Sequence, residues 1–156
     1  MTTPLRLALL AVAICASLVL AAGRAAASTA HHARASHATL GIRAVQFARH
    51  LLGTRYVYGG STPRTGFDCS GLVRYVYAHF GISLPHSSYA DFDLGRRVSR
   101  RGLRPGDLVF FHGLGHVGIY VGAGKFIHAP HTGTRVSYST LAEYGSEYDG
   151  ARRLVR

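Results

Sequence analysis

The spacing of apolar residues changes once along the chain, and this change constrains the fold more than any other feature. Up to about residue 94, apolar residues recur at helical spacing and glycines interrupt the pattern. From Leu108 onward the period is two, which is typical of strands with alternating faces. Helices followed by an antiparallel sheet predict an α+β fold, and 156 residues are about one domain's worth of chain.

The expected elements follow from these periods and from the residues that end them. Gly53 and Gly81 are expected to end the first two helices. Residues 55–67 are rich in glycine and turn formers and are predicted to be a loop. The expected helices are residues 40–52, 69–80 and 87–94, and the expected strands are 108–112, 116–121, 125–129, 134–138 and 152–155.

The first 39 residues differ in composition from the rest of the chain. Residues 1–27 contain Arg6, an apolar run and a final Ala-Ala-Ala, which is typical of a secretory signal peptide. The apolar run over residues 7–22 is shorter than the roughly 20 residues that span a bilayer. We therefore expect cleavage and export rather than a retained anchor, with a flexible linker at 28–39 and a catalytic domain at 40–156.

The net charge of +11 predicts attraction to polyanions. Nucleic acid, an anionic membrane and the bacterial envelope all fit this charge, so the charge does not choose among them. One alternative function is therefore a secreted polyanion-binding protein, and its support is an arginine-rich stretch that also fits a solvated loop. That stretch contains Arg96, Arg97, Arg100, Arg101 and Arg104.

The exported chain contains a single cysteine, because Cys15 lies in the leader and Cys69 is the only other one. An unpaired cysteine in a secreted protein indicates an intermolecular bridge, a buried passenger or a nucleophile. Asp68 is a plausible N-cap, which puts Cys69 in the first turn of a helix. The backbone N–H groups there favour thiolate, so we expect a pKa below the reference of about 8.5.

Two histidines are predicted to meet on one face of the sheet. His116 and His128 lie on adjacent strands joined by the turn at 122–124. Such a pair suits a general base and the group that orients it. Each histidine also fits a buried core position, and a metal site including His112 or His131 is the less favoured alternative.

Three segments resemble the NlpC/p60-type cell-wall cysteine peptidases, in that family's order. They read YVYGGSTPRTGFDCSGLVRYVY, LRPGDLVFF and HVGIYVGAGKFIHAP. The resemblance implies a papain-like fold, with a nucleophile-bearing helix packed on an antiparallel β-sheet. It implies that Cys69 is the nucleophile, His116 the base and His128 the third polar residue.

The resemblance also implies roles around this triad. Tyr56 matches a tyrosine beside the nucleophile, and Asp68 and Ser70 match positions that hold the substrate's free amino end. Asp107 is interpreted as a structural turn residue. Asp91 departs from the family, in which glutamine is common at this position.

The function implied by the resemblance is hydrolysis of peptidoglycan stem peptides, commonly at the bond between D-γ-glutamate and a diamino acid. We expect a secreted, periplasmic or cell-wall-associated monomer with no cofactor, no metal, no nucleic-acid partner and no stable membrane insertion. An acyltransferase or amidase on the same scaffold is a further alternative, since the same triad serves either acceptor.

Overall fold

The computed structural model describes residues 40–154. The predicted signal peptide and linker lie outside these residues. Residues 40–49 are helical, and within residues 40–154 no helix is both long and apolar enough to cross a membrane. The further elements are β1 (Ser61–Thr62), β2 (Gly66–Phe67), α2 (Cys69–Ala78), α3 (Ser88–Phe92), β3 (Arg96–Val98), η1 (Arg100–Gly102), β4 (Leu108–Phe111), β5 (His116–Gly122), β6 (Lys125–His128), β7 (Ser137–Thr140), η2 (Gly145–Glu147) and β8 (Tyr148–Arg153).

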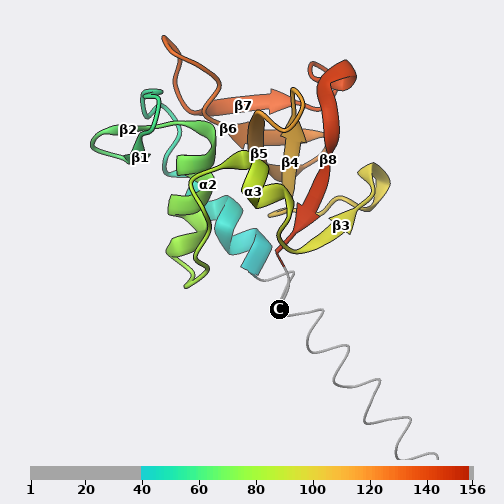
Figure 1. Ribbon diagram of the computed structural model, residues 1–156. Helices are drawn as coiled ribbons and strands as arrows, with labels where there is room; N and C mark the ends of the chain where they lie inside the picture. Colours follow the sequence, from blue (N-terminus) through green and yellow to red (C-terminus); the bar gives the residue numbers. More distant parts are fainter. Residues whose placement is uncertain (1–39, 155–156) are drawn as a thin grey trace, which may run out of the picture. The chain divides into compact units, whose positions relative to one another are not determined.

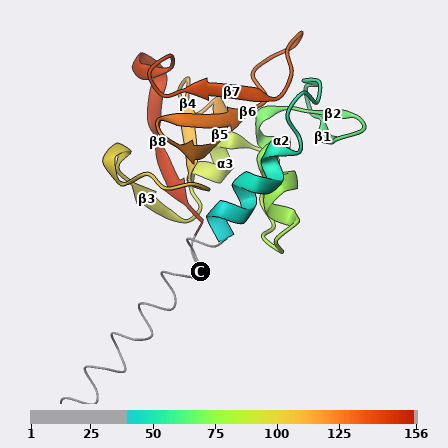
Figure 2. The same ribbon diagram turned by 180° about the vertical axis from the view of Figure 1, so that it is seen from behind.

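The main sheet has six strands in the order β3-β8-β4-β5-β6-β7, and every neighbouring pair is antiparallel. Figure 1 shows α2 and the helix at 40–49 together beside this sheet. Figure 2, seen from behind, shows β3 and β8 at the end of the body opposite the β1–β2 hairpin. The predicted α+β fold, with a nucleophile-bearing helix on an antiparallel sheet, is confirmed.

Apolar side chains cover both faces of the sheet. On one face, side chains of the two helices pack against β4, β5 and β6 and exclude water from that layer. On the other face, the segment after β7 covers the sheet through Leu141 and Tyr144. Because both faces are covered, β5 is buried from His116 to Tyr120. A histidine on this strand is therefore largely withdrawn from water.

The structure differs from the predicted elements where strand pairing is distant in sequence. β7 begins at Ser137 instead of residue 134, and the last strand is Tyr148–Arg153 instead of 152–155. The arginine-rich stretch is not all loop, because Arg96–Val98 form β3. The predicted loop at 55–67 contains the short hairpin β1–β2. The strand propensities of these segments were too weak to predict their pairing, which depends on tertiary contacts.

Asp107 has the structural role that the sequence indicated. Its carboxylate accepts a hydrogen bond from the Arg104 backbone N–H at 2.7 Å, which closes the turn before β4. The same carboxylate accepts from Nε and a terminal nitrogen of Arg153, both at 2.6 Å. Asp107 is 1% exposed, so this ion pair joins the start of β4 to the end of β8 in a nearly water-free setting.

Asp91, the residue that departs from the family pattern, is fully buried in α3. Neither carboxylate oxygen has a hydrogen-bond partner among the described residues. Burial raises the pKa of Asp91 from 3.8 to about 7. Between pH 3.8 and about pH 7, the folded state thus keeps a proton that the unfolded state has already lost. The stability that Asp91 contributes therefore falls as the pH rises through this range.

We expect Asp91→Asn to stabilise the protein at pH 8 and to change stability much less at pH 4. The isosteric amide cannot ionise, so the gain is the penalty of a buried, unpartnered carboxylate, roughly 1–3 kcal/mol. Urea unfolding at the two pH values measures this difference. Asp93→Asn, at an exposed position near the end of the same helix, is the matched control and should change little. An equal gain from Asp91→Asn at both pH values would contradict the assignment.

Candidate active site

Cys69 is the first residue of α2, and the sequence dictates why the helix begins there. Asp68 has extended backbone angles, φ −91° and ψ 179°, and its side chain accepts from the Gly71 backbone N–H. This is the N-cap that the sequence predicted. Leu72 and Val76 bury the apolar face of the helix. The thiol is therefore at the N-terminus of a helix whose first turn is capped by Asp68 and whose apolar face is packed in the core.

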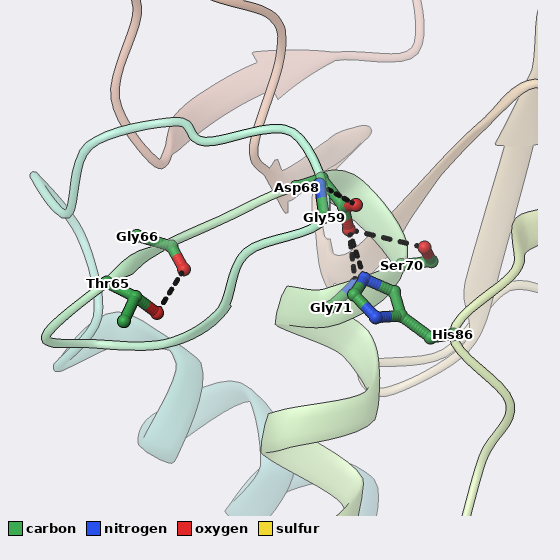
Figure 3. Close-up of polar contacts among 7 residues, drawn as sticks. All are labelled: Gly59, Thr65, Gly66, Asp68, Ser70, Gly71 and His86. Carbon is green, nitrogen blue, oxygen red and sulfur yellow. Dashed lines mark hydrogen bonds and ion pairs between the residues drawn. The ribbon is translucent and has the colours of Figure 1, made fainter.

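The Asp68 carboxylate also ties two distant segments to the helix, as Figure 3 shows. Oδ1 accepts from the Gly71 N–H at 2.7 Å and from the Ser70 hydroxyl at 3.3 Å, and it lies 2.9 Å from Nε2 of His86. Oδ2 accepts from the Gly59 N–H at 2.9 Å. The predicted binding residues Asp68 and Ser70 thus contact each other, and both are buried. Their role toward a substrate amine stays a prediction.

The loop before the helix approaches it very closely. A Cβ at Gly71 would lie 2.1 Å from the carbonyl oxygen of Gly60, so only glycine fits at this point of the helix. The Asp68 N–H also donates to the Gly60 carbonyl at 3.0 Å. This loop carries Tyr56 into the site, where its backbone N–H donates to Thr134 at 2.9 Å. The glycines of this loop are therefore part of how the site is assembled.

The Cys69 thiol is half-buried where α2 meets β5. Burial raises its pKa, the Asp68 charge raises it further, and N–H groups of Val117, Ser70 and Cys69 itself lower it. The net direction is upward, so the sequence-based expectation of a lowered pKa is wrong. The cause is the tertiary packing of Cys69. The N–H groups at the helix N-terminus lower the pKa as expected, but desolvation of the thiol against the sheet raises it by more. At neutral pH the resting residue is a thiol.

Tyr56 lies close enough to Cys69 for the two ionisations to interact. Burial raises the pKa of the Tyr56 phenol, and the charges of Cys69 and Asp68 raise it further. The side chain is half-buried and packs against the same core cluster as Cys69. Its hydroxyl is thus neutral at neutral pH and can donate a hydrogen bond, and its role toward the nucleophile stays a prediction.

The rings of His116 and His128 form a direct contact across β5 and β6. Nε2 of His116 lies 2.7 Å from Nδ1 of His128, which is within hydrogen-bond distance. A Cβ at Gly118 would lie 2.6 Å from the Phe126 ring and 3.3 Å from the Cβ of His128. The glycine leaves room for the β6 side chains to lean over β5. This brings the two histidines together.

The hydrogen bonds of this pair are compatible with two tautomers, and only one of them leaves Nδ1 of His116 free to accept a proton. His116 uses Nε2 toward His128, so its only free ring nitrogen is Nδ1. Nε2 of His128 lies 3.1 Å from the Ser139 hydroxyl. If each ring holds one proton, Nδ1 of His116 accepts a proton only when its Nε2–H donates to His128 and Nε2–H of His128 donates to Ser139. The chain His116–His128–Ser139 therefore supports a base at Nδ1.

Aromatic rings surround the histidine pair and keep it neutral. The Tyr144 ring centroid lies 5.6 Å from that of His128 and 6.3 Å from that of His116. The pKa of His116 is lowered from 6.5 to about 4, mainly by burial and to a smaller extent by the like charges of His112 and His131. Burial also lowers the pKa of His128, with a smaller contribution from His116. Both imidazoles are uncharged at neutral pH and available as acceptors.

Three contributors to this site escaped the sequence analysis. His86 is not among the site residues expected from the sequence, but it contacts Asp68 across 18 positions of sequence. Ser139 and Tyr144 had no local signal, because each reaches the histidine pair through the pairing or covering of strands. The alternative metal site gains no support, since the described residues contain no cluster of three or more potential metal ligands.

Comparison with known proteins gives a consistent picture. The model of the NlpC/P60 family matches residues 53–153. The chain is 43% identical over 128 residues to a gamma-DL-glutamyl hydrolase of Bacillus subtilis, covering 77% of the chain and 31% of that protein. It is 41% identical over 136 residues to the murein DD-endopeptidase MepH of Escherichia coli, covering 81% of the chain and 49% of that protein. The chain thus spans less than half the length of these relatives.

Solved structures agree with the sequence relatives. The NlpC/p60 domain of the peptidoglycan hydrolase SagA superposes with a TM-score of 0.66 at 35% identity, covering 72% of this chain and 97% of that one. The peptidoglycan hydrolase RipB of Mycobacterium tuberculosis gives a TM-score of 0.69 at 29% identity, covering 79% of this chain and 68% of that one.

We expect His116 to stay neutral, with its proton on Nε2, from pH 8 down to about pH 5. Its pKa is lowered to about 4, so the folded state resists a proton that the unfolded chain accepts near pH 6.5. The stability that the neutral His116 contributes is fully present above pH 6.5 and is lost as the pH falls toward 4. Ring 15N chemical shifts, assigned with a His116→Ala variant, measure both tautomer and titration. Protonation near pH 6.5 or a proton on Nδ1 would contradict the assignment.

Proposed function

The chain belongs to the NlpC/P60 family, and we propose that it is a secreted cysteine endopeptidase that hydrolyses stem peptides of peptidoglycan. The observation that carries the proposal is the placement of Cys69 at a capped helix N-terminus beside β5, the strand that bears His116. The relatives named gamma-DL-glutamyl hydrolase and murein DD-endopeptidase support this class of reaction. No cofactor is part of the proposal.

The first step transfers a proton as the sulfur attacks. Because both thiol and imidazole are neutral at rest, Nδ1 of His116 takes the Cys69 proton while the sulfur bonds to the amide carbon. The carbonyl becomes an oxyanion. The Cys69 backbone N–H at the helix N-terminus and the Tyr56 hydroxyl are the donors that we assign to it.

The second step expels the amine. The imidazolium of His116 returns its proton to the amide nitrogen, the C–N bond breaks and a thioester remains on Cys69. Water then attacks the thioester with His116 again as base, the C–S bond breaks and the thiol is restored. His128 accepts from His116 through Nδ1 during both proton transfers, which holds the ring in the productive tautomer.

The bond that we propose is the one between D-γ-glutamate and a diamino acid. The resemblance implies it, and the name of the Bacillus subtilis relative supports a γ-glutamyl bond. The name of the Escherichia coli relative denotes a different murein bond, so the family alone does not choose. Asp68 and Ser70, at the start of α2, are the residues that we assign to the substrate's free amino end. We place the enzyme at the cell wall.

We expect wild-type protein to release peptides from purified peptidoglycan and Cys69→Ala to release none. Mass analysis of the soluble products identifies the bond by the new amino end that each carries. Circular dichroism and thermal unfolding show whether the variant folds, since the thiol is only half-buried. Hydrolysis by a folded alanine variant would overturn the role of Cys69. Products joined to an added amine would instead indicate an acyltransferase.

We expect His116→Ala to lose nearly all activity and His128→Ala to keep a measurable fraction. Without His116 no group carries the proton to the amine, whereas without His128 the base still reaches Cys69 in part of its rotamers. Oriented bases contribute about 100- to 10,000-fold, so the smaller loss should lie at the lower end. His128→Glu tests whether a carboxylate replaces the imidazole. Full activity of His128→Ala would demote His128 to a core histidine.

A further inference from the structure

Like charges face each other at one edge of the sheet. In the antiparallel pair β3–β8, Arg96 lies opposite Arg153 and Arg97 lies opposite Arg152. Like charges directly opposite each other on neighbouring strands destabilise a sheet. Two such pairs in a row lower the stability of the sheet. The catalytic site does not explain them, because β3 and β8 lie away from α2 (Figure 2).

Only one of these four arginines is neutralised within the described residues. Arg153 forms the ion pair with Asp107. Arg152 stacks over the Phe92 ring, 4.1 Å from its centroid, and its Nε donates to the Phe92 carbonyl. Arg96 and Arg97 are exposed, and among residues 40–154 neither forms an ion pair. The edge therefore retains three guanidinium groups without an acidic partner in the structure described.

A cavity of about 380 Å³ opens beside this pair of strands. Arg97 and Arg100 line it, together with the rings of Phe92 and Tyr148. Arg100 lies over the Tyr148 ring, 5.3 Å from its centroid, and donates to a backbone carbonyl at 3.0 Å. The aromatic rings thus hold guanidinium groups in place, which reduces the entropy that a ligand must remove. The one acid in the lining, Asp149, already accepts from the Leu114 N–H at 2.8 Å.

We propose that the arginine edge, defined as Arg96, Arg97, Arg100 and Arg152, binds the phosphate groups of a linear polyol-phosphate polymer. The planar guanidinium presents a fork of donors that matches phosphate and carboxylate geometry alike, so a binding comparison with poly-γ-glutamate decides between the two anions. Arg101 and Arg104 extend the exposed charge along the chain. Consecutive residues of β3 point to opposite faces of the sheet, so a chain with regularly repeated negative charges can follow the sheet edge and contact groups on both faces.

The aromatic residues of the cavity argue for a polymer without bases. Binding of single-stranded nucleic acid uses open aromatic faces on which bases stack. Here Arg152 covers the face of Phe92 and Arg100 covers that of Tyr148. The edge therefore offers charge and donors without a free stacking platform. This favours a polyol-phosphate chain over DNA or RNA.

The site is separate from the proposed peptidase chemistry. The residues that line the cavity do not include Cys69, His116 or His128. Binding of the polymer by the arginine edge does not require hydrolysis of a peptide bond. Binding is therefore measurable with a polymer that contains no peptide, and failure of either proposal is distinguishable from failure of the other.

The test measures binding of poly(glycerol phosphate) by the full chain and by two double variants with equal charge loss. Arg97→Gln/Arg100→Gln alters the arginine edge, and Arg49→Gln/Lys125→Gln alters an open cavity of about 570 Å³ elsewhere. We expect the first variant to weaken binding at least 10-fold at 0.15 M salt and the second less than 3-fold. Arg97→Lys/Arg100→Lys keeps the charge without the fork and should recover only part of the loss.

Four outcomes would overturn the proposal. Equal weakening by both glutamine variants would mean that only net charge matters. Equal affinity for poly-γ-glutamate would remove the preference for phosphate, and tighter binding of oligo(dT) would indicate nucleic acid. Arg100 also contacts Tyr148, so Arg97→Gln alone, at an exposed position, provides a variant whose folding is not in question. It should weaken binding by at least 3-fold, and unchanged binding would also overturn the proposal.

Discussion

The Asp68 carboxylate is the interaction on which the candidate site depends. It caps α2, fixes the loop that carries Tyr56 through the Gly59 N–H, and contacts His86 from the segment after the helix. A carboxylate that accepts several N–H bonds in a buried setting holds its partners far more firmly than an exposed one. Three segments of chain are thereby brought to one point. Cys69 is next in sequence, so its position follows from theirs.

The same burial that orders the site also sets its chemistry. Desolvation raises the pKa of the thiol and lowers the pKa of both histidines, so the resting groups are all uncharged. A charged thiolate–imidazolium pair would require this enclosed setting to solvate two ions. A neutral thiol–imidazole pair requires no such solvation of ions, and charge then develops only as the sulfur attacks. Electrostatic stabilisation concentrated at that stage lowers the barrier rather than the ground state.

The sequence predicted those parts of the fold and site that arise from local rules. A cap residue before an apolar helix places Cys69, and strand alternation around a glycine turn places His116 and His128 on one face. What it could not predict depends on distant contacts. The partner of β3 is β8, more than 40 residues later in the sequence, and the neighbour of Asp68 is His86. The direction of the Cys69 pKa shift failed for the same reason, since no local pattern shows how much sheet will cover a helix end.

The strand order has a consequence for how the chain reaches its folded state. β8 is the last strand in sequence, yet it lies between β3 and β4. In a chain that emerges from its N-terminus, β4, β5, β6 and β7 can form a meander by joining neighbours in succession, while β3 must wait for β8. Closing such a long loop is entropically slow compared with forming a hairpin. Completion of the sheet is thus a late event, and until then the edge of β4 is open to wrong partners.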